Sequence, residues 1–123
     1  MEHSAGFLRL VQDAKRRVRE TSCEEVRRRQ ERSEPFTLVD VREDGEWAAG
    51  RITGAIHLGK GVIERDVERV APDPATPLVL YCGGGYRSAL AADALRQLGY
   101  RNVESMDGGW KRWLELGYPV TRG

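Results

Sequence analysis

A short apolar run that leads directly into a glycine-rich turn constrains the fold of this chain more than any other segment. Residues 78–81 read Leu-Val-Leu-Tyr, the composition of a buried strand. Cys82 and three consecutive glycines follow, and then a helical pattern begins near Ser88 and ends at Gly99. A buried strand that passes through glycines into a helix is typical of an α/β domain with a parallel sheet.

The rest of the chain alternates between strand and helix patterns in the same way. Further strands are predicted at residues 36–41, 55–58 and 102–106, and further helices at 43–49, 62–70 and around 110–114. We therefore predict one three-layer α/β domain over residues 35–123, with a parallel central sheet flanked by helices on both faces.

The first 34 residues are predicted to form an N-terminal helical extension that packs on this domain. Apolar residues at helical spacing predict a helix over residues 7–19. Ser22 and Glu25 have the spacing of a capping box, which predicts that a second helix starts there and ends before Pro35. We assign this extension no catalytic role.

Charge and cysteine content exclude several classes of protein. Twenty basic and nineteen acidic residues give a net charge of +1, which argues against nucleic acid or an anionic membrane as the main partner. No apolar run is long enough to cross a membrane, and the N-terminus lacks the pattern of a secretory signal. Two isolated cysteines predict reduced thiols and a cytoplasmic location, and two separate histidines make no metal-ligand cluster.

Position in the predicted sheet selects Cys82 as the candidate reactive residue. Ligands of parallel sheets bind beyond the carboxyl ends of the strands, where Asp40 and Cys82 lie. The glycines and the helix start would aim several backbone N–H groups at Cys82, which favours its thiolate. Arg87 would add a positive charge at the rim or tie the loop to a carboxylate. The alternative is an inert core cysteine, which needs neither the glycines nor the arginine. For Cys23, a packed thiol is favoured over an exposed resolving thiol.

Three ordered blocks within residues 36–121 resemble the rhodanese family of single-domain sulfurtransferases. The first runs from Leu38 to Glu43 and continues through Glu46-Trp47 and residues 50–55, the second is Cys82–Ser88, and the third is residues 107–110 with Trp113 and residues 117–120. Against the family pattern, Arg51 replaces a common His, Thr53 a Pro and His57 an Asn, all in predicted supporting structure. The loop also lacks a Lys, which predicts weak binding of thiosulfate and a different natural donor.

The resemblance implies transfer of a sulfane sulfur in two steps. Cys82 would take sulfur from thiosulfate or a related persulfide, and the resulting Cys82 persulfide would pass it to cyanide, a cellular thiol or a protein acceptor. No metal or organic cofactor is required. The implied binding loop comprises Gly83, Gly84, Gly85, Tyr86, Arg87 and Ser88. Asp40, Arg42 and Glu46 are candidate supporting residues, more readily interpreted as structural ion pairs than as catalytic helpers.

Two other classes of function stay open. Cysteine-dependent phosphatases and arsenate reductases on this fold usually have five residues between the Cys and the Arg, whereas four separate Cys82 from Arg87. Non-catalytic regulatory modules commonly lack the loop cysteine, which this chain keeps. Both observations favour sulfur transfer.

Overall fold

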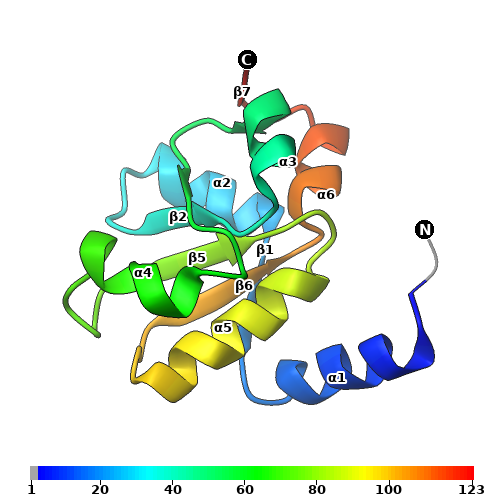
Figure 1. Ribbon diagram of the computed structural model, residues 1–123. Coiled ribbons are helices and arrows are strands. Elements are labelled where there is room, and N and C mark those ends of the chain that lie inside the picture. The colour runs from blue at the N-terminus through cyan, green and yellow to red at the C-terminus, as the bar shows by residue number, and fades with distance from the viewer. Residues whose placement is uncertain (1–2) are drawn as a thin grey trace.

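The computed structural model describes residues 3–123 and has a five-stranded parallel sheet at its centre (Figure 1). The strand order is β1-β6-β5-β2-β4, and every pair in it is parallel. The strands are β1 (Arg19–Ser22), β2 (Thr37–Asp40), β4 (Ile56–His57), β5 (Leu78–Tyr81) and β6 (Val103–Asp107). The prediction of an α/β domain with a parallel central sheet is confirmed.

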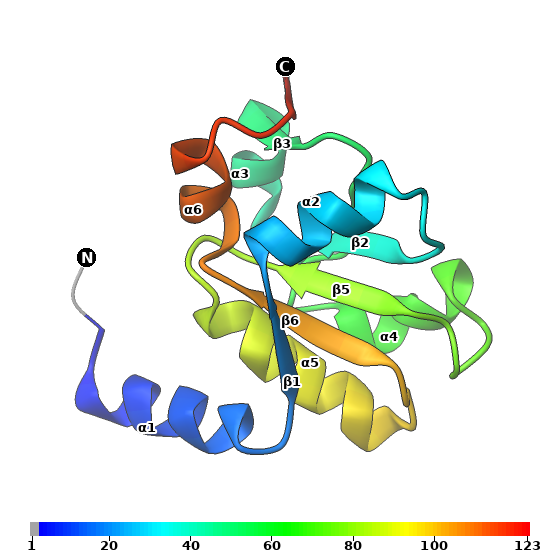
Figure 2. The same ribbon diagram turned by 180° about the vertical axis from the view of Figure 1, so that it is seen from behind.

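Helices cover both faces of this sheet (Figures 1 and 2). On one face α4 (Ile63–Val70) packs against α5 (Tyr86–Leu98), and α1 (Ala5–Lys15) lies along α5. On the other face lie α2 (Cys23–Glu31) and α6 (Gly109–Glu115). The short helix α3 (Asp44–Ala49) packs beside β3 (Gly50–Ile52), which pairs antiparallel with β7 (Val120–Arg122).

The central strand β5 is buried on both sides, which explains its uninterrupted apolar sequence. Leu78 and Leu80 belong to the core beneath α4 and α5, whereas Val79 and Tyr81 belong to the core beneath α2 and α6. Side chains of a strand alternate between its faces, so a strand covered on both faces must be apolar throughout. The same burial fixes the register of the sheet. It therefore also fixes the position of Cys82, which follows the carboxyl end of β5.

The N-terminal segment differs from its prediction. The helix expected over residues 7–19 ends at Lys15, and residues 19–22 form β1 instead. β1 lies at the edge of the sheet, and its exposed charged residues carry no apolar pattern, so backbone pairing with β6 determines its conformation. The antiparallel pair β3–β7 was not predicted either, because three-residue strands are too short to show a period.

The second predicted helix is present as α2. The Ser22 hydroxyl accepts the Glu25 backbone N–H at 3.0 Å, and Cys23 and Val26 are fully buried in the core beneath α2 and α6. The boundary between residues 34 and 35 stays a prediction, and residues 1 and 2 of the predicted extension lie outside the described part. Within residues 3–123, no helix has the length and apolar character needed to span a bilayer.

We expect a fragment of residues 35–123 to lose cooperative folding. It lacks β1 and α2, and with them the buried side chains of Cys23 and Val26. With Val11 and Ala14 of α1, this burial contributes on the order of 5 kcal/mol, comparable to the whole stability of a small domain. Thermal denaturation followed by circular dichroism tests this against the whole chain. A fragment with an unchanged melting temperature would contradict it.

Candidate active site

Cys82 lies directly after β5, at the base of a pocket of about 470 Å³. The residue is only 1% exposed, yet it forms part of the pocket lining. The lining comes from the start of the chain, from the α3 region and from the loop after β5: His3, Phe7, Glu43, Glu46, Cys82, Gly83, Gly84, Tyr86 and Arg87. The sequence-predicted loop therefore surrounds the thiol, together with side chains from two other segments.

The Cys82 sulfur is held by groups at the start of α5. The Gly85 backbone N–H donates to Sγ at 3.1 Å, and the Ser88 hydroxyl lies 3.5 Å from Sγ. Ser88 in turn shares a hydrogen bond of 2.8 Å with the buried Ser105 hydroxyl of β6. Because the first N–H groups of a helix have no intrahelical acceptor, the start of α5 can offer a backbone donor to the sulfur, and Gly85 supplies it.

The segment that follows β6 holds the Cys82 loop in place through backbone hydrogen bonds. The Trp110 backbone N–H donates to the Cys82 carbonyl at 2.8 Å, and the Lys111 N–H donates to the Gly83 carbonyl at 3.0 Å. Gly109 has a φ of +54°, and a Cβ at this position would lie 2.4 Å from the Cys82 carbonyl oxygen. Only glycine permits both this conformation and this approach. Gly109 of the third block thus shapes the reactive loop.

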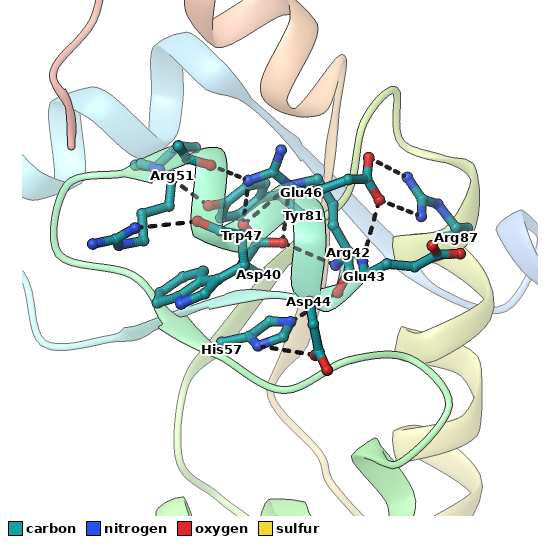
Figure 3. Close-up of polar contacts among 12 residues, drawn as sticks. Asp40, Arg42, Glu43, Asp44, Glu46, Trp47, Arg51, His57, Tyr81 and Arg87 are labelled. Carbon is teal, nitrogen blue, oxygen red and sulfur yellow. Dashed lines mark hydrogen bonds and ion pairs between the residues drawn. The ribbon is translucent and has the colours of Figure 1, made fainter. Parts of the chain in front are cut away.

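Asp40 and Arg42 form a buried ion pair (Figure 3). Their side chains are 2.8 Å apart, and Arg42 also donates to the Gly50 carbonyl. The guanidinium of Arg42 lies over the Trp110 ring at 4.6 Å. This pair therefore supports Trp110, whose backbone N–H donates to the Cys82 carbonyl. Such an arrangement positions the loop.

Arg87 and Glu46 form a second pair at the pocket rim (Figure 3). The Arg87 guanidinium lies 3.0 Å from the Glu46 carboxylate, and this hydrogen bond lowers the pKa of Glu46. Glu46 also accepts the Glu43 backbone N–H at the start of α3. Arg87 thus lines the pocket and ties the loop to the Glu46 carboxylate.

The residues that depart from the rhodanese pattern lie around α3, away from the Cys82 sulfur. His57 makes a 2.8 Å contact with the Arg42 carbonyl and stacks on Trp47 at 5.0 Å (Figure 3). Arg51 also lies over the Trp47 ring and donates to the Trp47 carbonyl. Thr53 contacts Thr121 between β3 and β7. These side chains stabilise one another in supporting structure.

Four residues near the loop had no assigned role in the sequence. His3 and Phe7 reach the pocket from α1 and the residue preceding its cap, although the extension was predicted to have no part in catalysis. No pattern in the sequence indicates which end of α1 faces Cys82. Ser105 is a polar residue in a buried strand, which is the sequence signal that could have identified it. The sequence shows Gly109 as part of the third block but does not show its contact with Cys82.

The second cysteine, Cys23, lies in the buried core, where its thiol is not reactive. Cys23 is completely buried, and its sulfur lies 3.5 Å from the Gly109 carbonyl. Burial, with Glu24 nearby, raises the pKa of Cys23 to about 11. The exposed resolving thiol considered for Cys23 is therefore wrong.

A family profile described as the rhodanese-like domain matches residues 22–116 of the chain. The thiosulfate sulfurtransferase GlpE of Tolumonas auensis is 32% identical over 68% of this chain and 76% of its own length. A sulfurtransferase of Allochromatium vinosum is 33% identical over 85% of this chain and 95% of its own length. The solution structure of the polysulfide-sulfur transferase homodimer of Wolinella succinogenes superposes with a TM-score of 0.79 at 30% identity, covering 95% of this chain and 88% of that one.

We expect Gly109→Ala to lower the free energy of unfolding by about 2–4 kcal/mol, because it adds a strained backbone conformation to a clash with the Cys82 carbonyl. Gly84→Ala, in the Cys82 loop that Gly109 contacts, is the matched control, since its Cβ would meet nothing within 4 Å. Denaturant titration should place the control within about 0.5 kcal/mol of the wild type. Equal stability of the two variants would contradict this role of Gly109.

Alkylation with iodoacetamide at pH 8 is expected to modify Cys82 rapidly and Cys23 very slowly. A thiol with a pKa of about 11 is roughly one part in a thousand thiolate at this pH, and Cys23 is also shielded from solvent. In Cys82→Ser, the remaining labelling should accelerate as the pH rises toward 11. Peptide mapping by mass spectrometry measures both sites. Comparable rates at the two cysteines at pH 8 would refute this assignment.

Proposed function

Because the chain belongs to the rhodanese-like domain family, we propose that it is a sulfurtransferase that carries a sulfane sulfur on Cys82. The observation that carries this proposal is the Gly85 N–H that donates to the Cys82 sulfur at the start of α5. The positive end of the α5 dipole would favour the anionic terminal sulfur of a persulfide. Relatives named sulfurtransferases, at 32–38% identity, support the same chemistry.

In the first step, the Cys82 thiolate attacks the outer sulfur of the donor. With thiosulfate, a new S–S bond forms to Cys82, the S–S bond of the donor breaks, and its electron pair leaves on sulfite. Charge is conserved, since a thiolate and a dianion become a persulfide anion and sulfite. The N-terminal N–H groups of α5 would stabilise the charge that moves onto the transferred sulfur.

In the second step, a nucleophile takes the outer sulfur from the Cys82 persulfide. With cyanide, the carbon–sulfur bond of thiocyanate forms, the persulfide bond breaks, and its electron pair returns to the Cys82 thiolate. A thiol acceptor, free or on a protein, would become a persulfide in the same manner. Neither step requires a metal or an organic cofactor, because the cysteine itself carries the sulfur.

The remaining loop residues bind the donor and position Cys82. Gly85 has a φ of +104°, which lets the backbone curl so that its N–H reaches the sulfur. Gly83 and Gly84 line the pocket, and Ser88 lies within reach of the sulfur. Asp40 and Arg42 would act only as positioning residues through Trp110, since the pair contacts that ring and lies outside the pocket lining. We also propose that the protein acts in the cytoplasm.

Chemistry on tetrahedral oxyanions fits the site less well. Such a mechanism needs an arginine free to bind the oxyanion within the loop. Here the Arg87 guanidinium is paired with Glu46 across the rim, and two carboxylates line the same pocket (Figure 3). Together with the short Cys82–Arg87 spacing, this arrangement favours sulfur transfer over phosphatase or arsenate reductase activity.

We expect the wild-type protein to form thiocyanate from a sulfane donor and cyanide, and Cys82→Ser to lose this turnover completely. Before cyanide is added, intact-mass spectrometry should show one additional sulfur atom on the wild type and none on Cys82→Ser. The matched control is Cys23→Ala, which removes the buried thiol and should retain sulfur loading.

A wild type that acquires no sulfur from thiosulfate, thiosulfonates or persulfides would refute the proposal. So would a Cys82→Ser protein that retains turnover, because another residue would then carry the sulfur. A donor that loads the wild type but not Cys82→Ser supports transfer through Cys82.

A further inference from the structure

The pocket above Cys82 has an aromatic wall that comes partly from the N-terminal helix. We propose that this wall, made of His3, Phe7 and Tyr86, selects sulfur donors whose transferable sulfur is attached to an apolar organic group. The proposal rests on sulfur transfer by Cys82 and names the class of donor. It assigns a substrate-binding role to α1, which lies outside residues 22–116 matched by the rhodanese-like profile.

The three rings contact one another at the pocket surface. The ring centroids of His3 and Tyr86 are 4.9 Å apart, and those of His3 and Phe7 are 5.0 Å apart. Phe7 and Tyr86 meet edge to face at 6.3 Å. All three residues line the pocket that has Cys82 at its base. A ligand that reaches the sulfur therefore passes along aromatic carbon.

This wall is fixed to the domain by the rest of α1. Val11 and Ala14 are buried against the core, with exposed fractions of 1% each. Further along the chain, Arg17 forms a 2.8 Å ion pair with Asp93 of α5. Lys15 lies 5.6 Å from the centroid of the Tyr86 ring and links α1 to the same loop. The aromatic surface is thus preorganised, which reduces the entropic cost of binding an apolar group.

The charges of the pocket disfavour a small dianion. Glu43 and Glu46 contribute two carboxylates to the lining, against the single guanidinium of Arg87. Arg87 is already paired with Glu46 at 3.0 Å. A dianion such as thiosulfate would therefore meet more negative than positive charge in the pocket lining. A donor with a single negative charge and an apolar group meets less repulsion and gains contact with the aromatic wall.

Thiosulfonates allow this inference to be tested with a single chemistry. The Cys82 thiolate attacks the outer sulfur of R–SO₂–S⁻, an S–S bond forms to Cys82, the donor S–S bond breaks, and its electron pair leaves on the sulfinate R–SO₂⁻. Two monoanions become two monoanions, so the step balances. Methanethiosulfonate and benzenethiosulfonate differ in the apolar group at constant charge, whereas thiosulfate differs from methanethiosulfonate mainly in charge.

We expect kcat/KM for sulfur loading of Cys82 to be about tenfold higher with benzenethiosulfonate than with methanethiosulfonate, from ring–ring contact and burial of apolar area. Each rate is divided by the rate of the same donor with a free small-molecule thiol, which removes the intrinsic difference in reactivity. Thiosulfate is expected to be the poorest of the three donors after the same correction.

Phe7→Ala and Phe7→Leu test whether the aromatic wall causes the preference for benzenethiosulfonate. Phe7→Ala should reduce the corrected benzene-to-methane ratio by about fivefold, and Phe7→Leu should reduce it less. Leu10→Ala is the matched control on the same helix, because this side chain is 58% exposed and lies outside the pocket. It should keep the wild-type ratio. Melting temperatures of all variants show whether α1 stays in place.

The outcomes separate this inference from the proposed function. If thiosulfate loads Cys82 and the corrected ratio in the wild type is near one, the aromatic selection is wrong and sulfur transfer stands. If Phe7→Ala lowers the rates of all donors equally, α1 has only a structural role and the inference fails. If no donor loads Cys82, the proposed function fails as well.

Discussion

The close contact between Gly109 and the Cys82 carbonyl is the constraint on which the rest of the site depends. A side chain at position 109 would occupy the space of the carbonyl oxygen, so the two backbone segments meet only because one is glycine. The contact lets Trp110 and Lys111 donate to the carbonyls of Cys82 and Gly83. The position of the loop that carries the thiol therefore follows from backbone geometry.

The two ion pairs near the site differ in their physical effect. Asp40 and Arg42 are buried, and burial of such a pair costs free energy that its own attraction barely offsets. Its contribution is geometric, since Arg42 holds the Trp110 ring beside the loop. The Arg87–Glu46 pair is partly exposed, with side-chain exposures of 32% and 41%, so solvent and salt weaken it. Because of this difference in burial, the Asp40–Arg42 pair is held in one place, whereas the Arg87–Glu46 pair at the pocket rim can adjust.

The sequence predicts the parts of the fold that bury apolar surface. β5 and α2 were predicted correctly, because a continuous apolar run and a Ser cap leave clear local signals. β1 was missed because an edge strand with exposed charges is held by pairing with β6, which no local pattern reveals. At the site, Cys82 and its loop were recognisable, whereas the aromatic wall depends on the tertiary packing of α1 against α5.

The groups proposed to perform the chemistry and those proposed to choose the donor come from different parts of the fold. The groups proposed to perform the chemistry come from one continuous loop, and their arrangement is fixed by short backbone contacts that tolerate little change. His3 and Phe7, which are proposed to choose the donor, come from a helix that joins the pocket only through its packing on α5. Substitutions on the pocket side of α1 can therefore alter which sulfur compound is accepted while the reaction at Cys82 stays the same. His3 and Phe7 lie outside the buried core, so changes at these positions cost the fold less than changes at Val11 or Ala14.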